Sequence, residues 1–106
     1  VKKRLQTRCV RHTRLLSRPV QRVALCGGAG SFLFPHALQA GADAFITADY
    51  KYHEFFEADG QLLILDVGHF ESEQFTIELL HHIISQKFST FAVRQTEVTT
   101  NPVFYY

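Results

Sequence analysis

The stretch LLILDVGHFESEQF, residues 62–75, places a histidine and a glutamate where an apolar strand would end and a helix would begin. His69 and Glu73 are four positions apart, so both side chains lie on one face of a helix that starts near His69. An imidazole nitrogen and a carboxylate oxygen suit divalent ions such as zinc, manganese, iron or magnesium. Because a metal centre normally takes three or more protein ligands, this pair predicts half of a site.

The same two residues also have a purely structural explanation. Glu71 and Glu73 would both lie in the first turn of the predicted helix, where the positive end of the helix dipole favours carboxylates. A histidine at the start of a helix is also compatible with a purely structural role, without any bound metal. The local pattern therefore leaves metal binding and simple helix stabilisation open.

Two other predicted strand ends carry residues that can do chemistry. CGGAGS, residues 26–31, would let backbone N–H groups approach an anion, but it lacks the Lys-Ser/Thr of a P-loop, and Leu33 replaces the third glycine of a dinucleotide fingerprint. TADYKYH, residues 47–53, carries Asp49 where a ribose-binding acid would be expected, so a nucleotide-binding module stays an alternative. His53 is the candidate catalytic residue for proton transfer or substrate contact.

Predicted strands alternate with predicted helices along the chain. Apolar and β-branched runs indicate strands at 8–16, 20–26, 42–49, 61–68 and 89–98, and helices are expected at 32–41, 51–58 and 70–87. This alternation predicts an α/β fold, a three-layer sandwich with a mainly parallel or mixed sheet. In such sheets ligands collect at the carboxyl ends of the strands, which is where the three motifs lie.

The length of 106 residues fits a single small hydrophobic core, and no apolar run approaches the roughly 18 residues needed to span a membrane. The chain begins on Val and contains no Met, so we expect a piece of a longer protein. Cys9 and Cys26 are too far apart for a zinc knuckle and are expected to be free thiols, which favours the cytoplasm.

The positive charge is concentrated at the start of the chain. Residues 1–22 hold eight of the eleven Lys and Arg and no acid. A basic arm of this kind can bind nucleic acid, but no aromatic residue interleaves the charges to stack on bases, so a solvated segment is the preferred interpretation. We predict a basic segment or linker from a preceding domain at residues 1–18 and a carboxyl-terminal α/β domain at residues 19–106.

Four stretches within residues 19–106 resemble the NGG-interacting-factor (Nif-three-like) family, known as type-2 GTP cyclohydrolase I homologues. They are VALCGGAGSF, GADAFITADYKYHEFF, LLILDVGHFESEQF and TNPVFYY. These stretches resemble the carboxyl-terminal half of the family's proteins. At the position of Ala48 the family usually has glycine. It implies a two-metal site in a cleft between two similar α/β halves. The family's Gly-His-x-x-x-Glu element maps onto His69 and Glu73, and its other ligands come from the amino-terminal half.

The resemblance also sets expectations about function. It implies a hydrolase-like protein with two divalent metal ions, acting on a nucleotide or related phosphate compound and assembling as a homo-oligomer, in the family a toroidal hexamer. The alternative is a non-enzymatic regulatory or scaffolding metal-binding protein that contacts a protein partner or, less favoured, nucleic acid. No membrane partner is expected. The identities of metal and substrate stay open.

Overall fold

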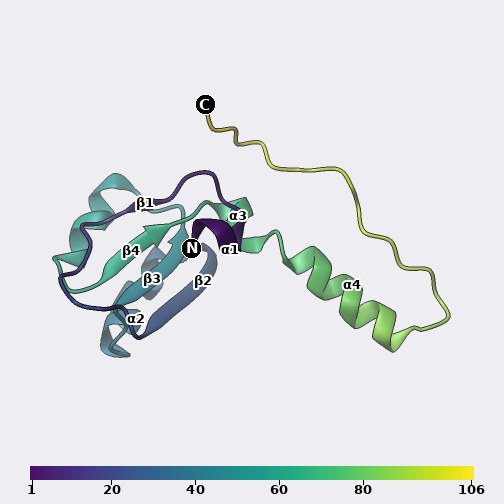
Figure 1. Ribbon diagram of the computed structural model, residues 1–106, viewed down its shortest axis with the longest axis horizontal. Helices are drawn as coiled ribbons and strands as arrows, with labels where there is room; N and C mark the ends of the chain where they lie inside the picture. The colour runs from purple at the N-terminus through teal and green to yellow at the C-terminus, as the bar shows by residue number, and fades with distance from the viewer.

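A mixed four-stranded sheet forms the body of the domain in the computed structural model, which describes residues 1–106 (Figure 1). The strand order is β1-β4-β3-β2. Strands β2 (Val23–Ala29), β3 (Ala44–Ala48) and β4 (Leu63–Asp66) are parallel, and β1 (Arg11–His12) pairs antiparallel with β4. The predicted α/β class and mainly parallel, mixed sheet are therefore confirmed.

Short helices connect the strands and a longer one follows them. The helices and 3-10 helices are α1 (Lys2–Leu5), η1 (Ser31–Leu33), α2 (Phe34–Gln39), η2 (Tyr52–Ala58), α3 (His69–Glu73) and α4 (Thr76–Lys87). None of them is long and apolar enough to cross a bilayer.

The core lies between one face of the sheet and the helices α2 and η2. Ala24, Phe45 and Ile64 are register partners across the three parallel strands, and their side chains belong to the cluster that packs against these helices. The next row, Leu25, Ile46 and Leu65, points to the opposite face because side chains alternate along a strand. Leu25 is 71% exposed, so the helices of this chain cover one face and leave an apolar row on the other.

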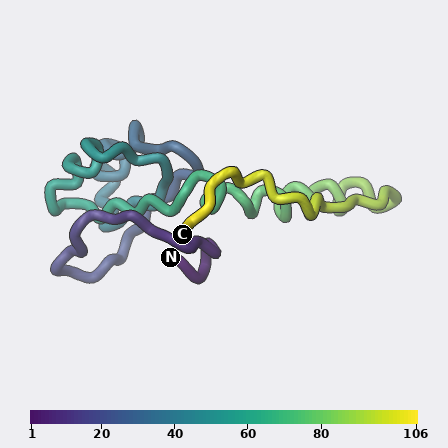
Figure 2. Tube along the Cα trace, turned by 90° about the horizontal axis from the view of Figure 1, so that it is seen from above, coloured from purple at the N-terminus to yellow at the C-terminus, as the bar shows by residue number.

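Helix α4 extends away from the sheet, and the chain then turns and runs back towards the domain (Figures 1 and 2). The predicted apolar stripe is present, but α4 has no buried residue, and Ile77, Leu80 and Ile83 are all exposed. The strand predicted at 89–98 is wrong: this segment has no regular structure. Its Val93 carbonyl oxygen lies 3.3 Å from the His81 ring nitrogen Nε2 on α4, and the segment joins none of the four strands of the sheet.

The single helix predicted at 70–87 is in fact two, α3 and α4. The break falls at Gln74 and Phe75, which form a turn. The Gln74 side-chain amide donates to the carbonyl oxygen of Leu5, 2.9 Å away, and this contact ties the end of α3 to the amino-terminal segment. The chain therefore changes direction between α3 and α4 where it contacts the amino-terminal segment, and the apolar periodicity of residues 70–87 did not predict this break.

Two predicted strands have different bounds in the structure. The strand expected at 20–26 begins later, at Val23, because the backbone N–H groups of Gln21 and Arg22 donate to the buried Asp43 carboxylate at 2.8 and 2.9 Å. It also continues through both glycines to Ala29. The strand expected at 8–16 is only the two-residue β1, which lies inside the predicted basic segment and joins the same sheet.

Candidate metal centre

The turn after β4 brings α3 over the ends of the parallel strands. Gly68 has a left-handed φ of +94°, and a Cβ at this position would clash with the Glu71 carboxylate. Only glycine adopts this conformation without strain, so it allows the abrupt change from strand to helix. Helix α3 then begins at His69, one residue before the predicted start, and packs mainly against β2.

His69 and Glu73 face each other across one turn of α3. The imidazole Nε2 lies 3.4 Å from a carboxylate oxygen of Glu73, and about half of each side chain is exposed. The other ring nitrogen, Nδ1, lies 2.6 Å from Oδ2 of Asp49. A carboxylate can only accept, so Nδ1 donates, and in the neutral ring this leaves the lone pair on Nε2, towards Glu73. The Nε2 lone pair and the Glu73 carboxylate thus face each other.

The Asp49 carboxylate also changes the acidity of the ring. Its hydrogen bond to Nδ1 is the largest effect and raises the pKa of His69 above the ordinary value of 6.5. Desolvation, the next largest effect, lowers this pKa, and the Asp49 and Glu73 charges raise it. Asp49 reaches His69 from the end of β3, where its backbone is left-handed with a φ of 58°. Such a conformation is uncommon for a residue other than glycine, and it is found more often at functional sites.

The end of β2 completes the surroundings of the pair. A Cβ on Gly28 would lie 2.7 Å from a Glu73 carboxylate oxygen and 3.1 Å from His69 Nε2, so the space beside both groups depends on this glycine. The Gly28 N–H donates to the Ser72 hydroxyl at 2.8 Å and fixes β2 against α3. Residues 26–31 are therefore mostly strand rather than a loop at a helix N-terminus, and Gly28 lies against the Glu73 carboxylate, which would repel an anionic ligand at that position.

The pair opens into a cavity of about 590 Å³. One wall comes from the carboxyl-terminal segment, through Asn101, Pro102, Val103 and Tyr105. Burial and the nearby Glu71 carboxylate raise the pKa of Tyr105, and Glu71 is itself buried. The sequence reasoning assigned no site role to this segment, although TNPVFYY was among the stretches that carried the family resemblance.

The remaining chemistry-bearing residues do not add a third ligand. No group of three or more His, Cys, Asp or Glu side chains is arranged to hold a metal ion. His53 is exposed on η2 and is not among the residues that line this cavity, so its catalytic role stays a prediction. Cys9 and Cys26 are free thiols, as expected. The donors that could hold a metal here are therefore His69 and Glu73, and metal binding by them stays a prediction.

Comparison with known proteins places the chain among relatives. The family model for Duf34/NIF3 (NGG1p interacting factor 3) matches residues 1–102. The chain belongs to the NIF3 family. Two of its relatives are both called "GTP cyclohydrolase 1 type 2 homolog". The one from Campylobacter jejuni is 36% identical, over 76% of this chain and 32% of its own length, and the one from Streptococcus pneumoniae is 38% identical, over 82% and 34%.

Solved structures agree with this membership of the NIF3 family. The hypothetical protein SA1388 of Staphylococcus aureus superposes with a TM-score of 0.90 and 27% identity, over 99% of this chain and 36% of that one. A Bacillus cereus protein related to NIF3 gives a TM-score of 0.78 with 27% identity, over 99% and 30%. The chain thus spans about a third of the length of the NIF3 relatives that it matches.

Proposed function

We propose that His69 and Glu73 are two ligands of a divalent-metal centre in a hydrolase-like protein that acts on a nucleotide or a related phosphate compound. The observation that carries this proposal is the 3.4 Å pairing of His69 Nε2 with the Glu73 carboxylate, with the opposite ring nitrogen held by Asp49. The name that the relatives bear, GTP cyclohydrolase 1 type 2 homolog, supports a nucleotide as the substrate class.

Each residue of the site has a separate task in this proposal. Asp49 holds the His69 ring in the tautomer that presents Nε2, and Gly28 keeps the adjacent space free. His53 is proposed for proton transfer or substrate contact. A divalent ion, when bound, supplies polarisation of a substrate oxygen and activation of water for hydrolysis. The centre would hold two ions, with the remaining ligands supplied by the longer protein, as the family resemblance implies.

The test combines metal content with turnover of a nucleotide panel that includes GTP, using the full-length protein. His69→Ala and Glu73→Ala should each abolish stoichiometric metal and metal-dependent turnover. Helix α4 offers a matched control, because Glu78 and His82 are also an exposed Glu and His spaced four apart. Glu78→Ala and His82→Ala should leave both quantities unchanged. Stoichiometric metal in His69→Ala would contradict the proposal.

A non-enzymatic scaffolding role is the second candidate, and one observation favours it. Helix α4 has no buried residue although it carries an apolar stripe, which includes Leu80 and Ile84. Exposed apolar surface of this extent is typical of a surface that another chain or domain covers. In this version the metals are structural and the protein is a homo-oligomer, a hexamer by resemblance to its family. Bound metal without turnover, together with loss of the oligomer in Leu80→Asp, would favour it over the hydrolase.

A further inference from the structure

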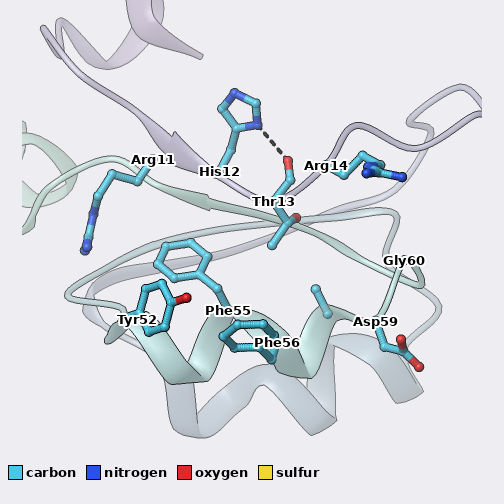
Figure 3. A pocket seen from close by; sticks show the side chains of 10 residues that line it. Arg11, His12, Thr13, Arg14, Tyr52, Phe55, Phe56, Asp59 and Gly60 are labelled. Atoms are coloured by element: carbon cyan, nitrogen blue, oxygen red, sulfur yellow. Dashed lines mark hydrogen bonds between the residues drawn. The ribbon is translucent and has the colours of Figure 1, made fainter.

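A second and larger cavity, of about 890 Å³, lies between the β1 segment and η2 (Figure 3). Its volume falls within the usual range for small-molecule sites. One side is formed by consecutive residues around β1 and the other by η2 and the turn after it. Its lining includes Arg11, Arg14, Tyr52, Phe55 and Phe56.

Two aromatic rings of this groove are exposed to solvent. Tyr52 is 79% exposed and Phe56 is 68% exposed. They are four residues apart on η2, with ring centroids separated by 5.5 Å and planes inclined at 78°. This edge-to-face contact favours the observed orientation of both rings in the absence of a ligand. Such a pair of exposed rings offers a platform on which a planar ring system can stack.

The groove also contains an anchored cation. The Arg11 guanidinium lies 5.4 Å from the centroid of the Phe55 ring, donates to the Tyr50 carbonyl oxygen at 2.8 Å and pairs with the buried Asp66. It is therefore held at the wall between the groove and the metal-centre cavity, and it lines both. Arg14 adds a second guanidinium at the rim of the groove.

The groove and the metal centre are close along the chain as well. Asp49, which contacts His69, is only three residues before Tyr52. Even a fully extended chain would separate their Cα atoms by no more than about 11 Å. A ligand with a ring at one end and a phosphate at the other can therefore extend from the groove, past Arg11, towards His69 and Glu73.

We infer that the groove binds the base of a nucleotide whose phosphate lies towards the His69–Glu73 centre; this inference rests on the proposed function and adds a base-binding subsite to it. The sequence had argued against nucleic-acid binding by the basic segment because no aromatic residue interleaves its charges. The fold supplies the missing rings, since η2 places Tyr52 and Phe56 opposite Arg11 and Arg14. An apolar peptide would gain nothing from the two guanidinium groups.

The experiment measures base binding without metal, so that it is independent of catalysis. Guanosine monophosphate and ribose phosphate are titrated into the full-length protein in EDTA, by calorimetry and by the NMR shifts of the Tyr52 ring. Ribose phosphate is the matched probe because it lacks only the base. The nucleotide should bind at least about tenfold more tightly, the size of effect that stacking on one aromatic ring gives.

Variants then assign the effect to the rings. Tyr52→Ala and Phe56→Ala should each weaken nucleotide binding by about tenfold, with ribose phosphate unaffected, whereas Tyr52→Phe should keep the affinity because the ring remains. Phe91→Ala is the matched control: Phe91 is 69% exposed and forms a similar edge-to-face pair with Phe88, beyond the end of α4. It should leave binding unchanged.

Three outcomes would overturn the inference. Equal affinities for the two probes would show that no base is recognised. Unchanged nucleotide binding in Tyr52→Ala and Phe56→Ala, with circular dichroism showing an intact fold, would show that the rings are not the platform. Tighter binding of a single-stranded oligonucleotide than of the mononucleotide would identify a nucleic-acid surface instead. Failure of the proposed metal centre would be seen in a different measurement, the metal content of the protein prepared without EDTA. It would leave the EDTA titrations unchanged.

Discussion

Oδ2 of Asp49, at the end of β3, lies 2.6 Å from Nδ1 of His69, at the start of α3, although the two residues are twenty positions apart in the chain. This contact fixes the orientation of the ring that faces Glu73. It connects a strained backbone position to the candidate metal ligands, and the first two predictions follow from it.

Asp49→Asn should lower the pKa of His69 and weaken metal binding by the full-length protein. The amide carries no charge to favour the imidazolium, and a lost outer partner of a metal-binding histidine typically costs about 10- to 100-fold in affinity. An NMR titration of the His69 ring in metal-free protein, with calorimetry for zinc or manganese, measures both effects. Asp59→Asn is the control, because Asp59 is also an acid with a left-handed backbone but does not contact His69. An unchanged His69 pKa in Asp49→Asn would contradict the prediction.

The same pair should make the stability of the metal-free protein depend on pH. Because folding raises the pKa of His69 above its ordinary value of 6.5, the protonated pair stabilises the fold fully below that value. The contribution is lost as the pH rises through the raised, folded-state pKa. Urea unfolding between about pH 5 and pH 8, the range in which an imidazole titrates, should therefore show a larger difference between wild type and Asp49→Asn at the acidic end. A difference that grows towards the alkaline end would have the wrong sign.

Gly28→Ala should abolish metal binding and destabilise the fold. The Cβ meets the Glu73 carboxylate at 2.7 Å, and the left-handed backbone adds roughly 1–2 kcal/mol of strain. Gly60→Ala separates the two effects, because Gly60 has a similar φ of +70° but no atom within 4 Å of the added Cβ. Gly60→Ala should show the strain alone, measured by urea unfolding, and should retain the metal.

Residues 1–106 by themselves should bind zinc or manganese only weakly, with a dissociation constant in the micromolar range or poorer as a rough estimate. Two ligands leave an ion mostly hydrated, and no third metal-capable side chain joins His69 and Glu73. Isothermal titration of this chain and of the full-length protein makes the comparison. Stoichiometric nanomolar binding by the isolated, monomeric chain would show that the half-site interpretation is wrong.

His53→Ala should lower any activity of the full-length protein and leave its metal content unchanged. The side chain follows the same strand as Asp49 but is exposed on η2, outside the residues that line the metal-centre cavity. Elemental analysis and turnover of the same preparation provide the two readings. Loss of metal from this variant would make His53 a ligand instead of a group that transfers protons or contacts the substrate.

Some features of this protein were predictable because they depend on neighbours in sequence. The alternation of strands and short helices, the strand that ends before Gly68, and the shared face of His69 and Glu73 all follow from local periodicity and turn chemistry. These features identified the α/β fold and two of the candidate site residues. The stretches that carry the family resemblance are local in the same sense.

Tertiary structure alone decided what surrounds that pair. The parallel order of β2, β3 and β4 brings Gly28 and Asp49 to the same end of the sheet as His69, and the returning carboxyl-terminal segment adds Tyr105 to the cavity wall. Similarly, the break between α3 and α4 and the absence of the strand predicted at 89–98 depend on what each segment contacts. Periodicity reports which face of a segment is apolar; which distant backbone or side chain meets that face is set by the packing of the whole chain.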